Sequence, residues 1–181
     1  FGVSDFADLK ITSLDASGAK VSFSLTYENQ SAEAVLKIPG EHNAQNAAGA
    51  VAVLLGLGFD LADSLAAVAS FGGTDRRFQL HGDRRGVSVY DDFAHHPTEV
   101  AAALRAARAS VGEGRLITVF QPHLYSRTRI FYKEFAEALK ISDFSLVTAI
   151  YAAREDPEPG VTAELITNAA TEAPGIRLVS N

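Results

Sequence analysis

The sequence contains no cysteine, no methionine and no tryptophan among its 181 residues. Without cysteine, the chain cannot form disulfides, thiolate nucleophiles or the cysteine ligands of many zinc sites. A reducing compartment such as the cytoplasm is compatible with this composition, and we expect a cytoplasmic protein. Without methionine, the chain does not begin at a translation start, so we expect it to be a piece of a longer protein.

Positive charge is also scarce. The chain carries 16 Lys and Arg against 22 Asp and Glu, for a formal net charge of −6. Surfaces that coat nucleic acid or bind anionic membranes need clustered positive charge, so we expect neither partner. No apolar run reaches the roughly 20 residues that a membrane span needs. The 47% hydrophobic and 21% charged residues are typical of a globular protein with a substantial core.

Two glycine-rich catalytic motifs are missing as well. None of the five lysines follows a glycine-rich turn, so the sequence has no Gly-x-x-x-x-Gly-Lys-Ser/Thr phosphate loop. It also has no Gly-x-Ser-x-Gly elbow of the hydrolase type. If the protein uses a nucleoside triphosphate, we expect the cradle for its phosphates to lie outside these 181 residues.

The first part of the chain combines strands with helices. Residues 8–39 alternate short apolar runs with turn signals, which predicts antiparallel strands. Residues 42–56 and 61–71 have apolar positions at helical spacing, and Asp60 is the predicted N-cap of the second helix. The pattern changes at Gly72-Gly73-Thr74, where we place the boundary between the two domains.

The predicted domains are therefore 1–73 and 74–181. In the second, strands alternate with helices, which predicts an α/β domain with a parallel, doubly wound sheet. The predicted strands are 87–90, 116–120, 144–150 and 176–179, and the predicted helices are 97–110, 129–139 and 161–170.

Three unusually polar loops follow the predicted strands of this second domain. They span residues 91–96, 121–129 and 151–156, and together they contain acids, histidines and arginines. Ligands of an open parallel sheet bind outside the carboxyl ends of its strands. The three loops are therefore expected to share one rim, where this set of side chains points to an anionic ligand.

The first loop contains the pairs Asp91-Asp92 and His95-His96. A metal site needs three or four converging ligands, whereas neighbours in an extended chain point to opposite sides. We therefore favour no metal site here, although a metal-dependent hydrolase remains a rival hypothesis. We expect one aspartate to contact the ribose of a nucleotide and one histidine to contact a reacting amine or carboxylate, while the others brace the loop.

Two arginines lie in the second loop, just before or within the first turn of the next helix. A guanidinium near a helix N-terminus can clamp a phosphate or carboxylate in bidentate fashion. We assign that role to Arg127 and interpret Arg129 as a solvated surface residue. Arg76 and Arg77 lie at the predicted boundary, where an arginine could reach a ligand or brace the linker, and spacing leaves both open.

The helix that begins near residue 41 has a polar first turn. His42, Asn43 and Asn46 share one face of this turn because they are three or four residues apart. An asparagine side chain offers a donor and an acceptor together, as the edge of adenine requires. From spacing alone, however, we favour the simpler interpretation that these residues cap the helix.

Five motifs in this order resemble the Mur ligases of peptidoglycan synthesis. They are IPGEHNAQNAAGAVAV at 38–53, FGGTDRRFQ at 71–79, VYDDFAHHPTEV at 89–100, VFQPHLYSRTR at 119–129 and IYAAREDPEPGV at 150–161. The resemblance implies the end of a central ATP-binding domain followed by most of a Rossmann-like C-terminal domain. A UDP-sugar-binding domain and a phosphate loop would precede them, so the isolated chain is expected to be inactive.

The resemblance is greatest to the members that join L-alanine to UDP-N-acetylmuramate with ATP and Mg²⁺. It implies that the ATP-binding residues are His42, Asn43, Asn46, Arg77 and one or both of Asp91 and Asp92. It implies catalytic and substrate-binding roles for His95 and Arg127, and His123 is a further candidate for binding substrate. Most ligands of Mg²⁺ are expected outside this chain.

Two residues depart from the pattern of these members. Leu124 stands where many carry arginine, and Phe93 where many carry tyrosine, so polar contacts are expected to be lost near the amino-acid site. The first alternative is the related group that joins a whole tripeptide to the same sugar in cell-wall recycling. A nucleotide-binding module without catalysis is the second.

Overall fold

The structure is a computed structural model that describes residues 1–18, 20–173 and 175–179. The chain forms two compact units, Phe1–Phe93 and Ala94–Asn181. The domain boundary that the sequence pattern predicts between residues 73 and 74 falls inside the first unit, and it stays a prediction. No helix in the described part of the chain is both long and apolar enough to cross a membrane.

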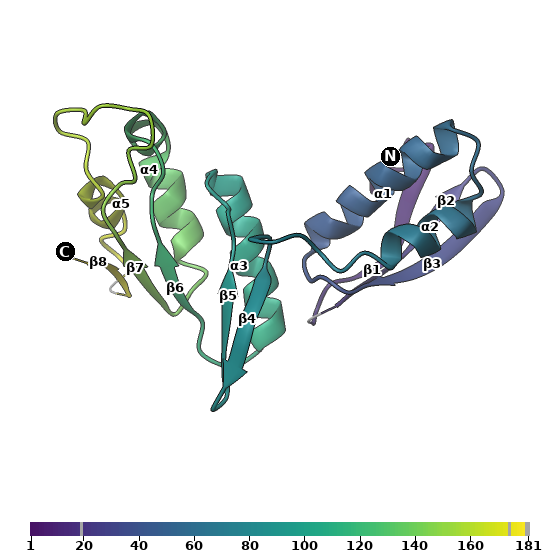
Figure 1. Ribbon diagram of the computed structural model, residues 1–181, viewed down its shortest axis with the longest axis horizontal. Coiled ribbons are helices and arrows are strands. Elements are labelled where there is room, and N and C mark those ends of the chain that lie inside the picture. The colour runs from purple at the N-terminus through teal and green to yellow at the C-terminus, as the bar shows by residue number, and fades with distance from the viewer. Residues whose placement is uncertain (19, 174, 180–181) are drawn as a thin grey trace. The chain divides into compact units, whose positions relative to one another are not determined.

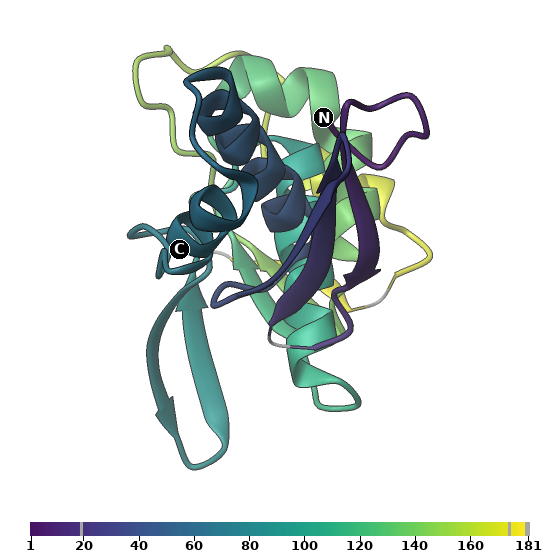
Figure 2. The same ribbon diagram turned by 90° about the vertical axis from the view of Figure 1, so that its right-hand side faces the viewer.

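The first unit contains a three-stranded antiparallel sheet in the order β1-β2-β3. Its strands are β1 (Leu9–Asp15), β2 (Val21–Tyr27) and β3 (Gln30–Leu36). Two helices, α1 (Glu41–Gly56) and α2 (Leu61–Ala69), lie on one face of this sheet (Figures 1 and 2). The antiparallel strands and both helices were predicted from the sequence and are confirmed.

The core of this layer forms because apolar positions alternate along the strands and recur at helical spacing. Val21, Phe23 and Leu25 of β2 are almost fully buried, as are Ala44 and Val51 of α1. Alanine on the buried face lets α1 approach the sheet closely. This packing fixes the position of the polar first turn of α1, which lies at one end of the same helix.

A β-hairpin completes the first unit and differs from the sequence prediction. It consists of β4 (Gln79–Arg84) and β5 (Val87–Asp91), which pair in antiparallel fashion and are largely exposed. Figure 2 shows it as a long arm. The strand predicted at 87–90 exists, but its placement in the parallel sheet was wrong, and β4 was not predicted. The Arg85-Gly86 turn has φ values of 55° and 75°, and arginine is an unusual residue for such a turn.

The second unit contains a parallel sheet in the order β6-β7-β8. The elements follow one another as α3 (Pro97–Val111), β6 (Ile117–Phe120), α4 (Tyr125–Leu139), β7 (Phe144–Val147), α5 (Glu164–Ala169) and β8 (Ile176–Leu178). Helix α4 packs against both α3 and α5 (Figure 1). The predicted α/β class with a parallel sheet is confirmed.

One prediction for this unit was wrong in a way that affects the site. The helix predicted at 129–139 begins four residues earlier, at Tyr125. The residue before it, Leu124, has φ 73° and ψ 136°, a conformation that bulky side chains rarely adopt. Leu124 is 6% exposed, so burial of its side chain holds this turn. Arg127 therefore lies in the first turn of α4, one of the two placements that the sequence left open.

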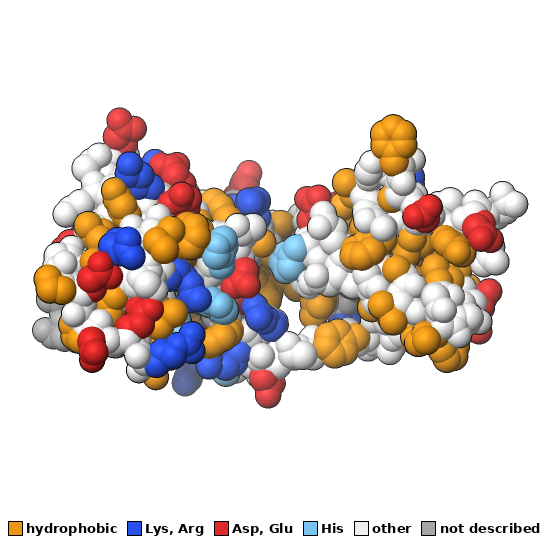
Figure 3. Space-filling model, turned by 90° about the horizontal axis from the view of Figure 1, so that it is seen from above, with side chains coloured by type: hydrophobic (Ala, Val, Ile, Leu, Met, Phe, Trp, Pro, Cys, Tyr) orange, Lys and Arg blue, Asp and Glu red, His pale blue; other side chains and the backbone are white. Residues whose placement is uncertain are grey.

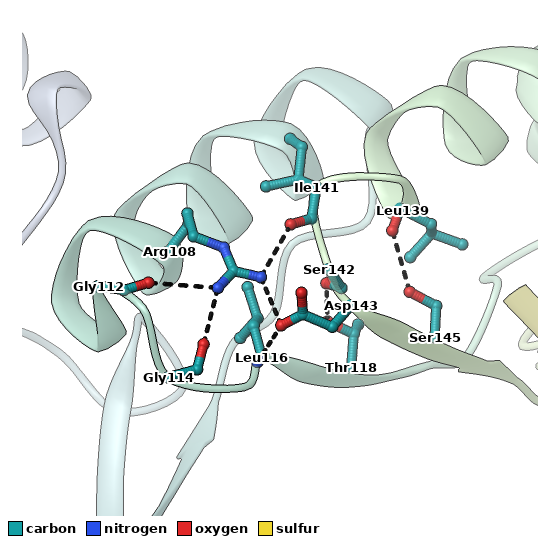
Figure 4. A network of polar contacts seen from close by, with 10 residues as sticks. All are labelled: Arg108, Gly112, Gly114, Leu116, Thr118, Leu139, Ile141, Ser142, Asp143 and Ser145. Atoms are coloured by element: carbon teal, nitrogen blue, oxygen red, sulfur yellow. Dashed lines mark hydrogen bonds and ion pairs between the residues drawn. The ribbon is translucent and has the colours of Figure 1, made fainter. Parts of the chain in front are cut away.

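A polar network fixes the other end of this unit (Figure 4). Arg108 of α3 donates to the backbone oxygen of Gly114 at 2.9 Å and to a carboxylate oxygen of Asp143 at 2.6 Å. The same carboxylate oxygen accepts from the backbone N–H of Leu116 at 2.7 Å. The network joins the end of α3, the start of β6 and the turn before β7, opposite the carboxyl edge of the sheet.

Candidate functional site

The first turn of α1 carries the polar residues that the sequence singled out in the first unit. The N-cap is Gly40, and no side chain caps the helix. The side-chain amide of Asn43 donates to the backbone oxygen of Pro39 at 2.7 Å, and Asn46 donates to the side-chain oxygen of Asn43 at 3.3 Å. The capping role expected for these residues was therefore wrong, since the asparagines brace one another along one face of the turn.

His42, on the same turn, is brought close to two other candidates. Surrounding protein atoms partly desolvate its ring, although the residue is exposed, and this lowers its pKa from the ordinary value. The charge of Asp92 raises the same pKa, while Arg77 lowers it. Within the first unit, Arg77 and Asp92 are thus close enough to act electrostatically on His42, which shares its helix turn with the paired asparagines.

The two aspartates have different surroundings. Asp92 accepts the backbone N–H of Phe78 at 2.8 Å and acts on His42. Asp91 accepts from Nε of Arg76 at 3.3 Å and lies 4.0 Å from a nitrogen of His81. Of the two, only Asp92 belongs to the group around His42. The guanidinium of Arg76, the neighbour of Arg77 at the predicted boundary, also lies 4.8 Å from the ring centre of Phe93.

In the second unit, the adjacent residues His95 and His96 have different roles, because His96 is the N-cap of α3. The side chain of His96 caps this helix by accepting the N–H of Thr98, and its ring packs edge-on against Phe131 with centroids 4.8 Å apart. The Glu99 carboxylate accepts from the backbone N–H groups of both His95 and His96. His96 thus has a structural role at the helix start.

His95 is left beside the carboxyl edge of the parallel sheet. Its Nδ1 lies 3.6 Å from the Glu99 carboxylate, and its ring centroid lies 6.1 Å from that of His123. His123 follows β6 and is also 5.6 Å from the ring centroid of Tyr151, which follows β7. Figure 3 shows histidine, basic and acidic side chains on this face of the second unit. Sequence reasoning missed Glu99, although its position three residues after His96 is typical of a capping box.

Arg127 reaches His123 from the first turn of α4. One of its terminal nitrogens, Nη1, lies 3.1 Å from Nδ1 of the imidazole. A guanidinium can only donate, so this nitrogen of His123 accepts and the proton of the neutral ring is on Nε2. Burial lowers the pKa of His123, and the charges of Arg127 and His95 lower it further. The ring is therefore a neutral hydrogen-bond donor at neutral pH.

The two arginines of this helix differ as expected. Arg127 is partly buried beside His123, whereas Arg129 is exposed and pairs with Glu158 at 2.9 Å. Leu124 is buried and packs beneath the turn. The edge therefore brings the Arg127 guanidinium beside the His95 and His123 imidazoles, and the charge of Arg154 also acts on His123. Such an arrangement can hold a carboxylate or phosphate and stabilise negative charge.

Metal-binding side chains do not gather in the described part of the chain. Among these residues, no three His, Cys, Asp or Glu side chains are arranged to hold an ion. Asp92 instead accepts a backbone N–H, and Asp91 pairs with Arg76. A hydrolase that uses the Asp and His pairs as metal ligands lacks support from this geometry.

Comparison with known proteins identifies relatives. The family model "Mur ligase, glutamate ligase domain" matches residues 76–181. The chain is 54% identical over 174 residues to UDP-N-acetylmuramate–L-alanine ligase of Clavibacter michiganensis subsp. michiganensis, covering 96% of this chain and 36% of that protein. It therefore spans little more than a third of the length of this curated relative.

Solved structures agree with this relationship. UDP-N-acetylmuramate-alanine ligase from Thermotoga maritima superimposes with a TM-score of 0.79 at 26% identity, over 98% of this chain and 38% of that one. A murein peptide ligase from Psychrobacter arcticus superimposes with a TM-score of 0.63, also at 26% identity, over 99% and 38%. Because the family model covers more than half of the chain, this protein belongs to the Mur ligase family.

Proposed function

We propose that this chain is part of an ATP-dependent ligase that joins L-alanine to UDP-N-acetylmuramate in peptidoglycan precursor synthesis. The observation that carries the proposal is the 54% identity, over nearly the whole chain, to a ligase named for this reaction. The polar groups at the carboxyl edge of the second unit fit an acid–amine ligation. The proposal includes a cytoplasmic location, because the reaction consumes ATP.

The proposed reaction has two steps. The lactyl carboxylate of the sugar attacks the γ-phosphate of ATP, which gives an acyl phosphate and ADP. The amine of L-alanine then attacks the acyl carbon, and inorganic phosphate leaves as the amide forms. Negative charge develops on the phosphoryl group and on the tetrahedral oxygen, so the protein contributes mainly by positioning and by stabilising that charge.

We assign nucleotide contacts to the group in the first unit. Asn43 and Asn46 offer amide donors and acceptors suited to adenine, and His42 offers a ring beside them. Arg77 supplies a positive charge, and Asp92 is the carboxylate of this group that suits a ribose hydroxyl. Asp91 is paired with Arg76 and is therefore a weaker candidate for contact with the ribose.

We assign contacts with the substrate carboxylates and the incoming amine to the second unit. Arg127 can hold a carboxylate, and His123 can donate through Nε2 because its other nitrogen faces the guanidinium. His95 lies beside them, with its Nδ1 near Glu99. Mg²⁺ accompanies ATP in this proposal. Since the described residues contain no group of three suitable ligands, its binding residues are assigned to other parts of the full-length protein.

The test uses the full-length protein that contains this chain. It should form UDP-N-acetylmuramoyl-L-alanine, measured by mass spectrometry, with one ADP released per product and only when ATP, the sugar nucleotide and L-alanine are all present. Preferential use of a tripeptide in place of L-alanine would support the cell-wall-recycling activity instead. Binding of ATP without turnover of any acceptor would support a non-catalytic nucleotide-binding module.

Two arginines in the same helix provide a matched pair of variants. Arg127→Ala should lower kcat/KM by about 100-fold, the loss expected when one positioned charge contact is removed, while ATP affinity stays unchanged. Arg129→Ala should behave as wild type, because Arg129 is exposed and pairs with Glu158. Unchanged turnover in Arg127→Ala would remove this residue from the proposed mechanism.

A further inference from the structure

Helix α4 begins without a cap from its own sequence. Its N-cap residue is Leu124, and no side chain at that position accepts the N–H groups of the first turn. Glu155, from the loop after β7, takes this place. The backbone N–H of Ser126 donates to Oε2 of Glu155 at 2.9 Å, and the Ser126 hydroxyl donates to Oε1 of the same carboxylate. Both carboxylate oxygens therefore hold one residue in the first turn.

The residue held in this way directly precedes Arg127. Arg127 in turn contacts His123 through Nη1, 3.1 Å from the imidazole Nδ1. We propose that Glu155 is a positioning residue of the ligase site, which fixes the first turn of α4 and thereby the directions of Arg127 and His123. This inference rests on the proposed function for the substrate contacts of those two residues.

A second set of bonds shows that the loop bearing Glu155 is anchored at its base. The Tyr151 N–H donates to the backbone oxygen of Pro122 at 2.8 Å, and the Leu124 N–H donates to the backbone oxygen of Tyr151 at 2.9 Å. These bonds extend the parallel pairing of β6 and β7 by one bridge. The base of the loop is thus fixed by the backbone, and Glu155, near the middle of the loop, is bound to α4.

The hydrogen bonds from Ser126 also affect the ionisation of Glu155. Its hydrogen bonds with Ser126, first from the hydroxyl and then from the backbone, hold the pKa of the Glu155 carboxyl below its ordinary value. The group is therefore ionised at neutral pH, at a helix N-terminus that favours negative charge. A carboxylate with both oxygens occupied by Ser126 is suited to hold structure and not to transfer a proton.

Three variants of the full-length protein test the role. Glu155→Ala removes both bonds. Glu155→Gln can keep them, since its amide oxygen accepts the Ser126 N–H and its amide nitrogen donates to the Ser126 hydroxyl. Glu158→Ala is the matched control, because Glu158 lies three residues further along and ties the same helix through exposed Arg129 at 2.9 Å.

We expect Glu155→Ala to raise KM for L-alanine or the sugar nucleotide, or to lower kcat, by about 10- to 100-fold, as a small displacement of positioned groups does. KM for ATP should change less than about twofold, Glu155→Gln should recover most of the activity, and Glu158→Ala should match wild type. Glu155→Gln as impaired as Glu155→Ala would overturn the proposal in favour of a role for the charge itself. An equal rise in KM for ATP would overturn it in favour of general destabilisation.

One readout does not depend on the ligase reaction. The ¹⁵N chemical shifts of His123 report which ring nitrogen carries the proton, and in wild type this should be Nε2. Glu155→Ala should shift the ring towards a mixture of tautomers, while Glu155→Gln and Glu158→Ala keep the wild-type spectrum. An unchanged spectrum in Glu155→Ala would contradict the positioning role even if the protein ligates other substrates. Absence of product with wild type would refute only the proposed function.

Discussion

Nη1 of Arg127 lies 3.1 Å from Nδ1 of His123. Burial is the largest cause of the lowered pKa of His123, and the charge of Arg127 is the next. Replacing Arg127 with Gln should therefore raise the pKa of His123 towards its ordinary value of 6.5 without reaching it. An NMR titration of the ring protons measures this change.

The lowered pKa of His123 also sets the sign of a pH effect on the free energy of unfolding. Because the pKa of folded His123 lies below that of the unfolded state, the unfolded chain binds more protons at acid pH. Stability is therefore complete above about pH 6.5 and falls as the pH drops through the folded pKa. Urea unfolding at several pH values should show a smaller slope in Arg127→Gln. Arg129→Gln, two residues away on an exposed position, should leave both the titration and this slope unchanged.

The pKa of His42 tests which aspartate belongs to the proposed nucleotide-binding group. Asp92 raises the pKa of His42, and Arg77 lowers it. We therefore expect the pKa of His42 to fall in Asp92→Asn and to rise in Arg77→Gln, as measured by NMR. Opposite shifts from the two variants would be hard to obtain from a general loss of structure.

Asp91→Asn is the matched control for this prediction. Asp91 contacts Arg76 and approaches His81, and it is not among the groups that shift the pKa of His42. The titration of His42 should not change, and the affinity for ATP in the full-length protein should fall more in Asp92→Asn than in Asp91→Asn. A larger effect of Asp91→Asn on both measurements would reverse the assignment.

Local sequence patterns were sufficient for much of the fold. The alternation in residues 8–39 predicted the antiparallel sheet, and helical spacing predicted α1 and α2 because each buries one apolar face. The three polar loops of the second domain were also visible, since each follows a predicted strand. In the second unit, two of these loops bring His123 and Tyr151 together by the parallel pairing of β6 and β7.

The missed features depend on unusual backbone conformations or on residues far apart in the sequence. Arg85 and Leu124 adopt positive φ where local preference favours glycine or asparagine, so the hairpin and the early start of α4 gave no signal. Glu155 caps a helix that begins 30 residues before it, through Ser126. No pattern within a short window can predict such a contact.

Asp60 is a predicted helix cap that the structure confirms. One oxygen of its carboxylate accepts the backbone N–H groups of Ala62 and Asp63, at 2.7 and 3.2 Å. Asp60→Ala should reduce the free energy of unfolding of the first unit by about 1 kcal/mol, the usual cost of removing an N-cap. Asp63→Ala removes a neighbouring acid from the same turn without removing the cap, and its effect in chemical denaturation should be clearly smaller. Equal effects of the two variants would attribute the stabilisation to charge near the helix dipole.

Arg108 and Asp143 connect three segments at the end of the second unit opposite the ligand edge (Figure 4). The hydrogen bond from Arg108 is the largest cause of the lowered pKa of Asp143, followed by the bond from the Leu116 N–H. Since the folded pKa lies below the ordinary 3.8, the carboxylate contributes stability above that pH, which is lost as the pH falls through the folded pKa. Arg108→Met keeps most of the side chain's apolar length but loses its bonds to Gly114 and Asp143. It should lower the Tm by roughly 2–4 °C and reduce the acid sensitivity.

Arg105→Met is the control for this variant, because Arg105 lies one turn earlier on an exposed face of α3. It should leave the Tm unchanged in the same calorimetric scan. The network lies away from His95, His123 and Arg127, so the rate of ligation at 25 °C should remain near wild type in Arg108→Met. If this variant is fully folded at 25 °C but its kcat is much lower, the network and the site are coupled.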